Sequence, residues 1–423
     1  MTSTWDIVIV GAGAAGLVAA RELSAAGKRV LLLEARDRIG GRIFTQHLPA
    51  YPVELGAEFV HGSPPEICDL ERQAGIPLSP LRWNVQHRRN GRWLDGQEST
   101  NDIDGLFEKM SANGPDESVQ EFLDRTRADE QAKQEVLRFV EGFHAADPRR
   151  MSVHALIRNN AAEEADFRQF RFVQGYDGLV RTIAERIDSR FCELRTNTKV
   201  TEIQWDRRHV QATAASGERF HANSALIAVP LGVLKSGSLE FHPRLMEKES
   251  AMQNLEMGPA VRVSLCFGSK FWEVQSRLKD VSFIFSDDQN FPTWWTSNPL
   301  PFPILTGWAA GRHARALGAL TREQVIQSAL GSLADILEMK PDAFNANLEA
   351  AFTHNWQSDE FSLGAYSYAL VGGSDAGRLL GAPVADTLYF AGEATDSDGR
   401  NGTVQGAIAG GLRAAKALLN GLL

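Results

Sequence analysis

The chain contains little cysteine and no motif built on it. Its 423 residues include only Cys68, Cys192 and Cys266, which lie far apart. They form neither a CxxC pair nor an even disulfide framework, so we expect a reducing compartment, the cytoplasm, and no bound metal. No hydrophobic run approaches the ~18 residues that a membrane-spanning helix needs. The first apolar run opens a glycine turn and does not resemble a signal peptide, so we expect no membrane association.

The chain also lacks the excess of basic residues that nucleic-acid-binding proteins carry. It has 44 lysines and arginines against 53 acidic residues, which gives a net charge of −9. This balance argues against a nucleic-acid partner and favours a cationic small molecule over an anionic one. Hydrophobic residues make up 43% and charged residues 23%, as in a globular protein, and the length fits two or three domain-sized units. The sequence gives no indication of the oligomeric state.

The first forty residues predict a βαβ unit built around a glycine-rich turn. Residues 6–10 form a short apolar run, residues 11–16 read Gly-Ala-Gly-Ala-Ala-Gly, and residues 17–26 are amphipathic. A second apolar run, residues 29–33, ends at Glu34. A GxGxxG turn between a strand and a helix, followed by an acid at the end of the next strand, is the dinucleotide-binding pattern.

Each conspicuous residue of this unit has a physical role in holding a dinucleotide. Gly11 permits the tight turn, Gly13 lets the backbone approach a pyrophosphate, and Gly16 lets the helix pack closely on the strand. The free N–H groups at the helix N-terminus attract phosphate. Glu34 is placed to accept hydrogen bonds from both ribose hydroxyls and disfavours a 2′-phosphate.

Two further signatures favour FAD over NAD. Residues 36–42 read Arg-Asp-Arg-Ile-Gly-Gly-Arg, in which the paired glycines allow close approach to a ligand and the two end arginines can bind phosphate oxygens bidentately. Near the C-terminus, residues 388–393 precede a second glycine turn, residues 401–407, which opens a helix. Such a turn suits a flavin, because the N1–C2 edge of the flavin gains negative charge on reduction.

The rest of the chain predicts an α/β fold with a helical insert. Residues 98–170 are polar, with apolar residues at helical intervals. Further strands are expected at residues 199–205, 225–229 and 261–265, and helices at residues 322–337 and 403–419. We therefore predict a doubly wound, Rossmann-type FAD-binding domain (residues 1–80, 195–235 and 350–423) interleaved with an α+β substrate-binding domain (residues 81–194 and 236–349).

Together these motifs resemble the flavin-containing amine oxidase family, which includes monoamine oxidases, polyamine oxidases and flavin histone-lysine demethylases. The resemblance runs from residue 6 to beyond residue 407 and is loose over residues 95–170. It implies an FAD domain of the doubly wound type and a substrate domain with a mixed sheet and flanking helices. The motifs that carry it are GAGAAG with Glu34-Ala35-Arg36, Arg38–Arg42, Glu54–Glu58, Phe271-Trp272, Asn355-Trp356, Gly364–Tyr366 and Phe390–Glu393.

The resemblance also implies a set of cofactor-binding residues. Glu34 resembles the ligand of the adenosine ribose, and Val200 resembles the residue whose backbone meets adenine. Trp356 resembles the tryptophan beside the flavin ring. The full expected set is Gly11, Gly13, Ala15, Gly16, Glu34, Ala35, Arg36, Gly40, Gly41, Arg42, Leu55, Gly56, Ala57, Glu58, Val200, Trp356, Gly392, Glu393, Thr403 and Val404.

Three positions depart from the family pattern. Arg262 stands where the family has a lysine that holds a water beside flavin N5, and Lys270 is out of register with that position. Because arginine keeps its charge, this change bears on the reaction with oxygen. Ala365 replaces the cysteine that tethers the flavin in some monoamine oxidases, which predicts non-covalent FAD. Tyr366 matches one wall of the aromatic cage, whereas the other wall aligns with Thr403, which has no ring.

The expected catalytic set is Arg262, Tyr366 and His61. Residues 59–63 are similar to a stretch of animal polyamine and spermine oxidases, and this similarity implies that His61 lines the substrate tunnel and contacts a substrate nitrogen. We expect Tyr366 and His61 on opposite sides of the amine. An ordinary imidazole pKa near ~6.5 would let His61 sense the charge of the amine.

Other conspicuous side chains are expected to be structural. His144 and His154 fall in the helical insert and should be ordinary surface or half-buried histidines. Trp294, Trp295 and Trp308 should pack in the core.

We therefore predict FAD-dependent oxidation of a C–N bond of a small-molecule amine, either a polyamine or a primary amine. The imine product would be hydrolysed to a carbonyl compound, and oxygen would be reduced to hydrogen peroxide. One alternative is a flavin dehydrogenase or desaturase that acts on an apolar substrate with another acceptor. Arg262 favours this alternative, whereas His61, Tyr366 and Trp356 oppose it. A second alternative is a non-catalytic flavin-binding module, which would need no substrate face.

Overall fold

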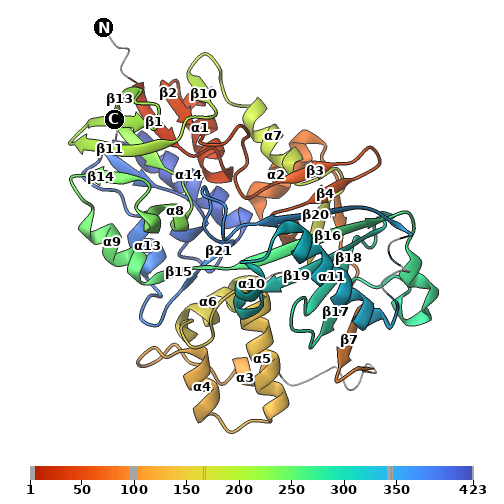
Figure 1. Cartoon of the computed structure of the whole chain (residues 1–423). Coiled ribbons are helices and arrows are strands. Elements are labelled where there is room, and N and C mark those ends of the chain that lie inside the picture. Colours follow the sequence, from red (N-terminus) through yellow and green to blue (C-terminus); the bar gives the residue numbers. More distant parts are fainter. Residues whose placement is uncertain are drawn as a thin grey trace.

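The glycine turn lies between the first strand and the first helix (Figure 1). It follows the carboxyl end of an inner strand of a largely parallel sheet. The computed structural model describes residues 5–94, 103–164, 166, 168–340, 344 and 346–421. Strand β1 (Trp5–Val10) leads into α1 (Ala14–Ala25), and β2 (Val30–Leu33) returns parallel to β1. Both apolar runs are buried because helices or loops cover both faces of the sheet, as expected for parallel strands.

This first sheet draws its strands from distant parts of the chain. Its order is β10-β2-β1-β13-β12-β11-β14, with β22 paired to β13. The C-terminal helix α14 (Val404–Gly421) packs beside α1, so the two ends of the chain build one core. The other strands are β10 (Cys192–Arg195), β11 (Val200–Asp206), β12 (His209–Ala214), β13 (Arg219–Ile227), β14 (Glu240–His242) and β22 (Leu388–Phe390).

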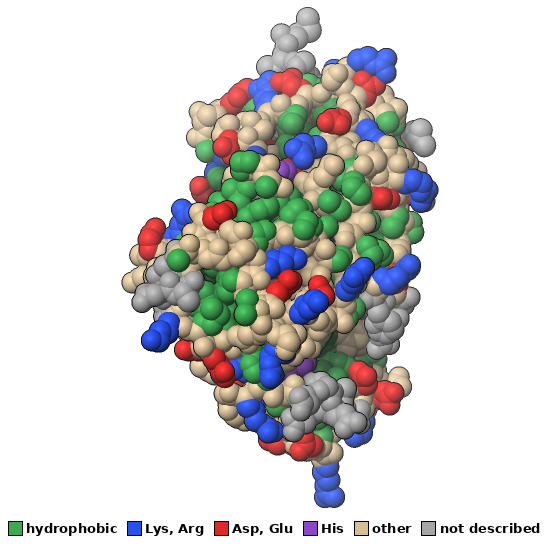
Figure 2. Space-filling view, turned by 90° about the vertical axis from the view of Figure 1, so that its right-hand side faces the viewer, with side chains coloured by type: hydrophobic (Ala, Val, Ile, Leu, Met, Phe, Trp, Pro, Cys, Tyr) green, Lys and Arg blue, Asp and Glu red, His purple; other side chains and the backbone are tan. Residues whose placement is uncertain are grey.

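A second, mixed sheet has the order β20-β16-β19-β18-β17-β7-β8. Helices α10 (Gly311–Leu317) and α11 (Arg322–Leu337) pack against it around a separate core. Hydrophobic side chains gather over the middle of the face seen from this side of the molecule (Figure 2). The strands are β7 (Val85–Arg89), β8 (Arg92–Trp93), β16 (Ala260–Phe267), β17 (Phe283–Ser286), β18 (Thr293–Thr296), β19 (Ile304–Ala310) and β20 (Leu348–Asn355).

The predicted helical insert forms a lobe beside the second sheet (Figure 1). The helices are α3 (Asp104–Phe107), α4 (Val119–Arg125), α5 (Glu130–Gly142) and α6 (Val153–Glu164). Capping explains two of their starts, because Ser118 and Glu121 form a capping box for α4 and Asp129 caps α5. None of the helices in the described ranges has both the length and the apolarity needed to cross a bilayer.

Shorter elements complete the fold. The short strands are β3 (Thr45–His47), β4 (Pro52–Glu54), β5 (Val60–His61), β6 (Leu78–Pro80), β9 (Gln169–Phe172), β15 (Leu255–Gly258) and β21 (Tyr366–Ala369). The helices are α2 (Pro65–Ala74), α7 (Asp177–Glu185), α8 (Leu231–Ser236), α9 (Met246–Gln253) and α13 (Ala376–Gly381), with 3-10 turns η1 (Phe271–Val274), η2 (Ser276–Leu278) and η3 (Glu393–Thr395).

Sheet membership differs from the predicted domain boundaries at three places. Strands β10 and β14 belong to the first sheet, although both lie mostly or wholly in segments assigned to the substrate domain. Strand β20 belongs to the second sheet, although most of it lies in a segment assigned to the FAD domain. Sheet membership is set by pairing between strands that are distant in the chain, which the composition of a short strand does not report. We propose that the boundaries follow sheet membership.

Candidate active site

One cavity of about 970 Å³ runs from the glycine turn to a group of aromatic side chains on the second sheet. Every predicted cofactor-binding and catalytic residue except Gly16 lines it. Gly16 instead lets the helix pack closely against the turn. Any other residue would place its Cβ 1.9 Å from the Gly11 carbonyl oxygen. Gly13 faces open space, since nothing lies within 4 Å of the position its Cβ would take. A phosphate can therefore approach the backbone at Gly13.

Glu34 is held rigidly at the end of β2. Its Oε2 accepts the Ala12 N–H at 2.7 Å, and its Oε1 accepts the Arg36 N–H at 2.9 Å. Each carboxylate oxygen can accept a second hydrogen bond, so the acid remains able to receive ribose hydroxyls. Glu34 is 6% exposed and lines the cavity, which fits the predicted adenosine-ribose contact.

Arg36 differs from the sequence prediction. Its two terminal nitrogens bind the Asp359 carboxylate at 2.9 and 2.6 Å, and one of them also contacts the Ser362 hydroxyl at 3.1 Å. The guanidinium lies 5.1 Å from the centre of the Phe361 ring. Its bidentate face is therefore used by a carboxylate of the chain and does not point free toward a phosphate. Asp359 is 323 residues away from Arg36, so this pairing could not be predicted from the sequence.

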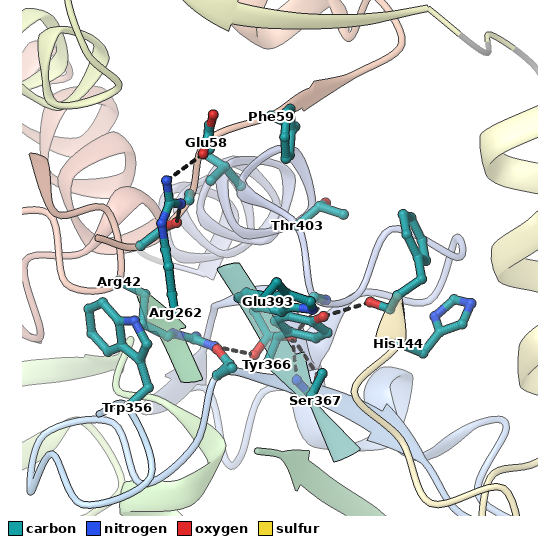
Figure 3. Close-up of a pocket in the computed structure, with 18 of the residues that line it drawn as sticks. Arg42, Glu58, Phe59, His144, Arg262, Trp356, Tyr366, Ser367, Glu393 and Thr403 are labelled. Carbon is teal, nitrogen blue, oxygen red and sulfur yellow. Dashed lines mark hydrogen bonds and ion pairs between the residues drawn. The ribbon is translucent and has the colours of Figure 1, made fainter. Parts of the chain in front are cut away.

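Arg42 forms hydrogen bonds to two segments that line the cavity, one at Ala365 and one at Glu393 (Figure 3). Its Nη1 donates to the Ala365 carbonyl and to the Glu393 carboxylate, both at 2.8 Å. The other oxygen of Glu393 accepts the Ser367 hydroxyl at 2.6 Å and the Gly402 N–H at 2.8 Å. Burial alone would raise the pKa of Glu393, but the Arg42 charge and these donors hold it below its usual value. Glu393 is therefore an ionised acid that fixes the loops about the cofactor space.

Arg262 lies in the cavity wall beside Glu58 (Figure 3). It projects from β16, forms an ion pair with Glu58, and donates to the Gly56 carbonyl at 3.1 Å. Arg171 binds the other oxygen of Glu58 at 2.7 Å, and the Trp295 indole donates to Glu58 at 3.0 Å. Burial alone would raise the pKa of Glu58, but the two arginines and the indole hold it below its usual value.

Two predicted flavin neighbours, Trp356 and Thr403, also line the cavity. The Trp356 indole donates to the Leu55 carbonyl at 2.9 Å, and Trp356 is 3% exposed. Thr403 precedes α14, and its hydroxyl accepts the Gly406 N–H at 3.0 Å. Lys270, the other cation considered for the lysine role, donates to the Leu300 carbonyl and does not line the cavity.

Tyr366 and His61 both line the cavity, and both contact Phe143. The Tyr366 hydroxyl donates to the Phe143 carbonyl at 2.6 Å (Figure 3). The His61 ring meets the Phe143 ring edge to face, with centroids 5.7 Å apart. Burial lowers the pKa of His61 to about 4, so the expectation that it titrates near neutral pH is wrong. A neutral imidazole can accept or donate one hydrogen bond but does not track the charge of an amine.

Several lining residues were missed or misjudged from the sequence. His144 is 9% exposed, lines the cavity beside Phe143 and has a pKa lowered to about 4 by burial, so it is not an ordinary surface histidine. Trp295 and Trp308 also line the cavity, whereas Trp294 packs in the core as expected. The three tryptophans alternate between the faces of β18 and β19, and only a known strand register separates them.

The comparisons with known proteins agree with this geometry. The family model described as flavin containing amine oxidoreductase matches residues 14–114 and 108–419. The chain belongs to this family. It is 31% identical to "Polyamine oxidase 3" of Oryza sativa subsp. japonica over 98% of this chain and 89% of that protein. It is 30% identical to "Lysine-specific histone demethylase 1 homolog 1" of Arabidopsis thaliana over 98% of this chain and 52% of that protein.

A solved structure supports the fold. Putrescine oxidase, described as wild type bound to putrescine, superposes with a TM-score of 0.83 at 21% identity, covering 99% of this chain and 100% of that one. The prediction of a flavin-containing amine oxidoreductase with an FAD-binding α/β domain and a substrate domain is confirmed. The cofactor is FAD, and the protein is an enzyme. These relatives do not favour the desaturase or the non-catalytic alternative.

Proposed function

We propose that this amine oxidoreductase oxidises a C–N bond of a polyamine or primary amine and uses oxygen as the electron acceptor. The amine would lose two electrons and two protons to give an imine, which water would hydrolyse to a carbonyl compound and a smaller amine or ammonia. Oxygen would take up the two electrons and two protons as hydrogen peroxide. Bound FAD would accept the hydride equivalent and pass the electrons on.

The observation that carries this proposal is the continuity of the cavity. One cavity is lined both by the residues that fit FAD and by the aromatic side chains that include Tyr366. An amine bound beside Tyr366 can therefore contact the cofactor directly. The Tyr366 ring offers a π face to the amine and excludes water on that side. His61 is neutral and can accept a hydrogen bond from an amine N–H.

The substrate class, the attachment of FAD and the cellular location are each supported by a separate observation. The polyamine part is supported by the printed names of the relatives, which are polyamine oxidases. Non-covalent attachment of FAD is supported by Ala365, which offers no sulfur for a thioether and lines the cavity. A cytoplasmic location is supported by Cys68, Cys192 and Cys266, which are all free.

The test uses purified holoenzyme and a panel of polyamines, aryl amines and amino acids. We expect polyamines or primary amines to bleach the flavin absorbance without oxygen, and to give one peroxide per carbonyl formed when oxygen is admitted. Bleaching by an amine followed by reoxidation only with an artificial acceptor would reject oxygen as the acceptor. No bleaching by any polyamine or primary amine would reject the proposed substrate class.

A further inference from the structure

The Arg262–Glu58 ion pair lies between the large cavity and a second, smaller one (Figure 3). Both residues line both cavities, and the second cavity has a volume of about 40 Å³. Arg171, Glu54 and four serine and threonine residues also line the second cavity. A polar cavity of this size has room for water, since one water needs only ~10–15 Å³. We call Glu54, Glu58, Arg171 and Arg262 the wall cluster.

Glu54 is the member of the wall cluster whose carboxyl group binds no arginine within the described part of the chain. Its Oε1 accepts the Tyr176 N–H at 2.7 Å, and its Oε2 lies 2.7 Å from the Thr45 hydroxyl. The Ser264 hydroxyl links it to the ion pair, because it accepts from Arg262 Nε and donates to the Glu54 carbonyl, both at 3.3 Å. The Glu54 carboxyl is therefore close to the charges of the wall cluster and remains free to gain or lose a proton.

The net charge of the wall cluster depends on this one proton. Arg171 and Arg262 are both paired with Glu58, and their charges keep that acid ionised. The cluster is therefore neutral when Glu54 is ionised and carries one positive charge when Glu54 is protonated. Burial raises the pKa of Glu54 to about 8, although its hydrogen-bond donors and Arg262 oppose this rise. At neutral pH the cluster is positive.

A polar path leads from Glu54 toward the protein surface. Thr45, which contacts the Glu54 carboxyl, also accepts the Asp177 N–H at 3.2 Å, and the Asp177 carboxylate lies 2.9 Å from the exposed His47 ring. The other ionisable groups around Glu54 and its hydrogen-bond partners are His47, Tyr176, Asp177 and Cys266. Burial raises the pKa of both Tyr176 and Cys266, so neither loses its proton near neutral pH.

We propose that Glu54 couples the reduction of bound FAD to the uptake of a proton, through the charge that it gives the wall cluster. Glu54 does not line the large cavity, so it is a positioning residue that acts through Arg262 and Glu58 and not by contact with the cofactor. This inference uses only the bound cofactor. It is independent of the amine and of the electron acceptor proposed above.

The charge of the wall cluster changes in step with that of the cofactor. Reduction adds two electrons and one proton to FAD, which leaves one extra negative charge in the large cavity. In the catalytic reaction the amine supplies these as a hydride equivalent, and its second proton goes to solvent. A nearby negative charge favours the protonated form of a carboxyl group. Where Glu54 is ionised, solvent therefore supplies one proton to it by way of Thr45, and the wall cluster gains the compensating positive charge.

The experiment measures the midpoint reduction potential of the holoenzyme against pH, with redox dyes and without amine. Each proton taken up with the two electrons adds about 30 mV per pH unit to the slope. Above about pH 8, where Glu54 is ionised in the oxidised protein, the wild-type slope should exceed that of Glu54→Gln by up to about 30 mV per pH unit. Below that pH the two slopes should agree, because glutamine matches the protonated acid in shape and charge. Glu349→Gln, which removes an exposed carboxyl group outside both cavities, should keep the wild-type slope.

A second measurement follows the proton itself. The reduced-minus-oxidised infrared difference spectrum of wild type above pH 8 should contain a C=O band of a carboxylic acid that shifts in D2O. The band should be absent from Glu54→Gln and present in Glu349→Gln. A purely structural role for Glu54 would produce no such band.

Two results would overturn the inference. One is an equal slope in wild type and Glu54→Gln at every pH, in protein that retains FAD. The other is the absence of the infrared band from wild type, or its persistence in Glu54→Gln. The wild-type spectrum decides the question even if Glu54→Gln fails to fold. Because neither measurement uses an amine or oxygen, the coupling can fail while the proposed function stands, and the reverse.

Discussion

Arg262 and Glu58 form an ion pair in the cavity wall that is buried on both sides, with 4% of the arginine and 10% of the glutamate side chain exposed. Arg171 occupies the second oxygen of Glu58, so one carboxylate lies between two guanidinium groups. The two guanidinium groups and one carboxylate leave a net positive charge in this buried cluster. A buried charge costs free energy unless a negative group lies close by. Arg262, which we predict to stand at the family's lysine position, is therefore fixed by partners and is not a free cation.

The first prediction concerns the reaction with oxygen. Arg262→Lys should raise the rate at which the reduced enzyme reoxidises, because lysine places a compact, rotatable donor in the wall and leaves room for a water. Arg262→Met should reoxidise slowly, since it removes the charge. Both variants should change flavin reduction by amine less than reoxidation. Stopped-flow measurement of the two half-reactions is the check.

Arg171→Lys is the matched control for this prediction. Arg171 binds the same Glu58 carboxylate. It lines a small second cavity and does not line the large cavity that holds the predicted cofactor-binding residues. If charge near Glu58 alone set the rate, Arg171→Lys and Arg262→Lys would behave alike. Equal reoxidation rates in wild type and both Arg262 variants would refute the positional argument.

The second prediction concerns FAD retention. Glu34→Ala should weaken FAD binding by about 1.5–3 kcal/mol, or roughly 10- to 150-fold in Kd, because one charge-assisted contact to the ribose is lost. The comparison variant is Glu360→Ala, which lines the cavity but pairs with Lys199 through a 63% exposed side chain. FAD affinity is measured by fluorescence titration of apoenzyme. A Kd within twofold of wild type for Glu34→Ala would show that this acid does not hold the cofactor.

Much of the cofactor half of the site could be predicted because its parts are local in the chain. Strand, glycine turn, helix and acid follow one another within forty residues. The turn and the helix act through their backbone N–H groups, and Glu34 acts through a carboxylate that the neighbouring backbone holds in place. The side-chain partners could not be predicted, because they are brought together only by the folded sheets. Asp359 reaches Arg36, and Phe143 reaches Tyr366, across 323 and 223 residues respectively.

The substrate half was harder to predict for a second reason. Burial decides the chemistry of a histidine, and a single sequence does not report burial. His61 was expected to titrate near neutral pH, and His144 to be ordinary, yet burial lowers the pKa of each to about 4. Likewise Trp294 and Trp295 are adjacent, and only the strand decides which of them faces the cavity.

The third prediction follows from those two histidines. The unfolded chain binds protons at His61 and His144 below about pH 6.5, whereas the folded protein binds them only near pH 4. Stability should therefore fall as pH drops from about 6.5 to 4, by up to ~1.4 kcal/mol per pH unit for each group. Glu54 opposes this trend, because burial raises its pKa to about 8 and it holds a proton that the unfolded chain releases.

The double variant His61→Gln/His144→Gln isolates the histidine contribution. Its melting temperature should fall less than that of wild type between pH 7 and pH 5, while Glu54 acts equally in both proteins. Thermal unfolding of the two holoenzymes at both pH values is the measurement. Parallel decreases in the two proteins would contradict the lowered histidine pKa values.

The fourth prediction concerns the attachment of the flavin. Ala365, which we predict to stand at the position where some family members tether FAD, has no sulfur, and its carbonyl accepts a hydrogen bond from Arg42 at 2.8 Å. Acid precipitation of the holoenzyme should therefore release all the yellow colour into the supernatant. Colour that remains with the washed pellet would show a covalent bond formed elsewhere in the chain.

The fifth prediction separates the ring of Tyr366 from its hydroxyl. The ring lies in the cavity wall, whereas the hydroxyl donates to the Phe143 carbonyl at the end of α5. Tyr366→Phe keeps the π face and removes one neutral hydrogen bond, worth about 0.5–1.5 kcal/mol of stability. We expect it to lower the melting temperature and to leave the limiting rate of flavin reduction within about twofold of wild type.

Tyr366→Ala should behave differently, because it removes the ring that orients the amine and excludes water. The limiting rate of anaerobic flavin reduction should fall roughly 2- to 30-fold, which corresponds to the ~0.5–2 kcal/mol range of a cation–π contact. Rapid-mixing absorbance at saturating amine gives this rate directly for both variants. If Tyr366→Phe lost as much rate as Tyr366→Ala, the link from Tyr366 to Phe143 would be the important feature, and Tyr366 would act by fixing α5 and not by facing the substrate.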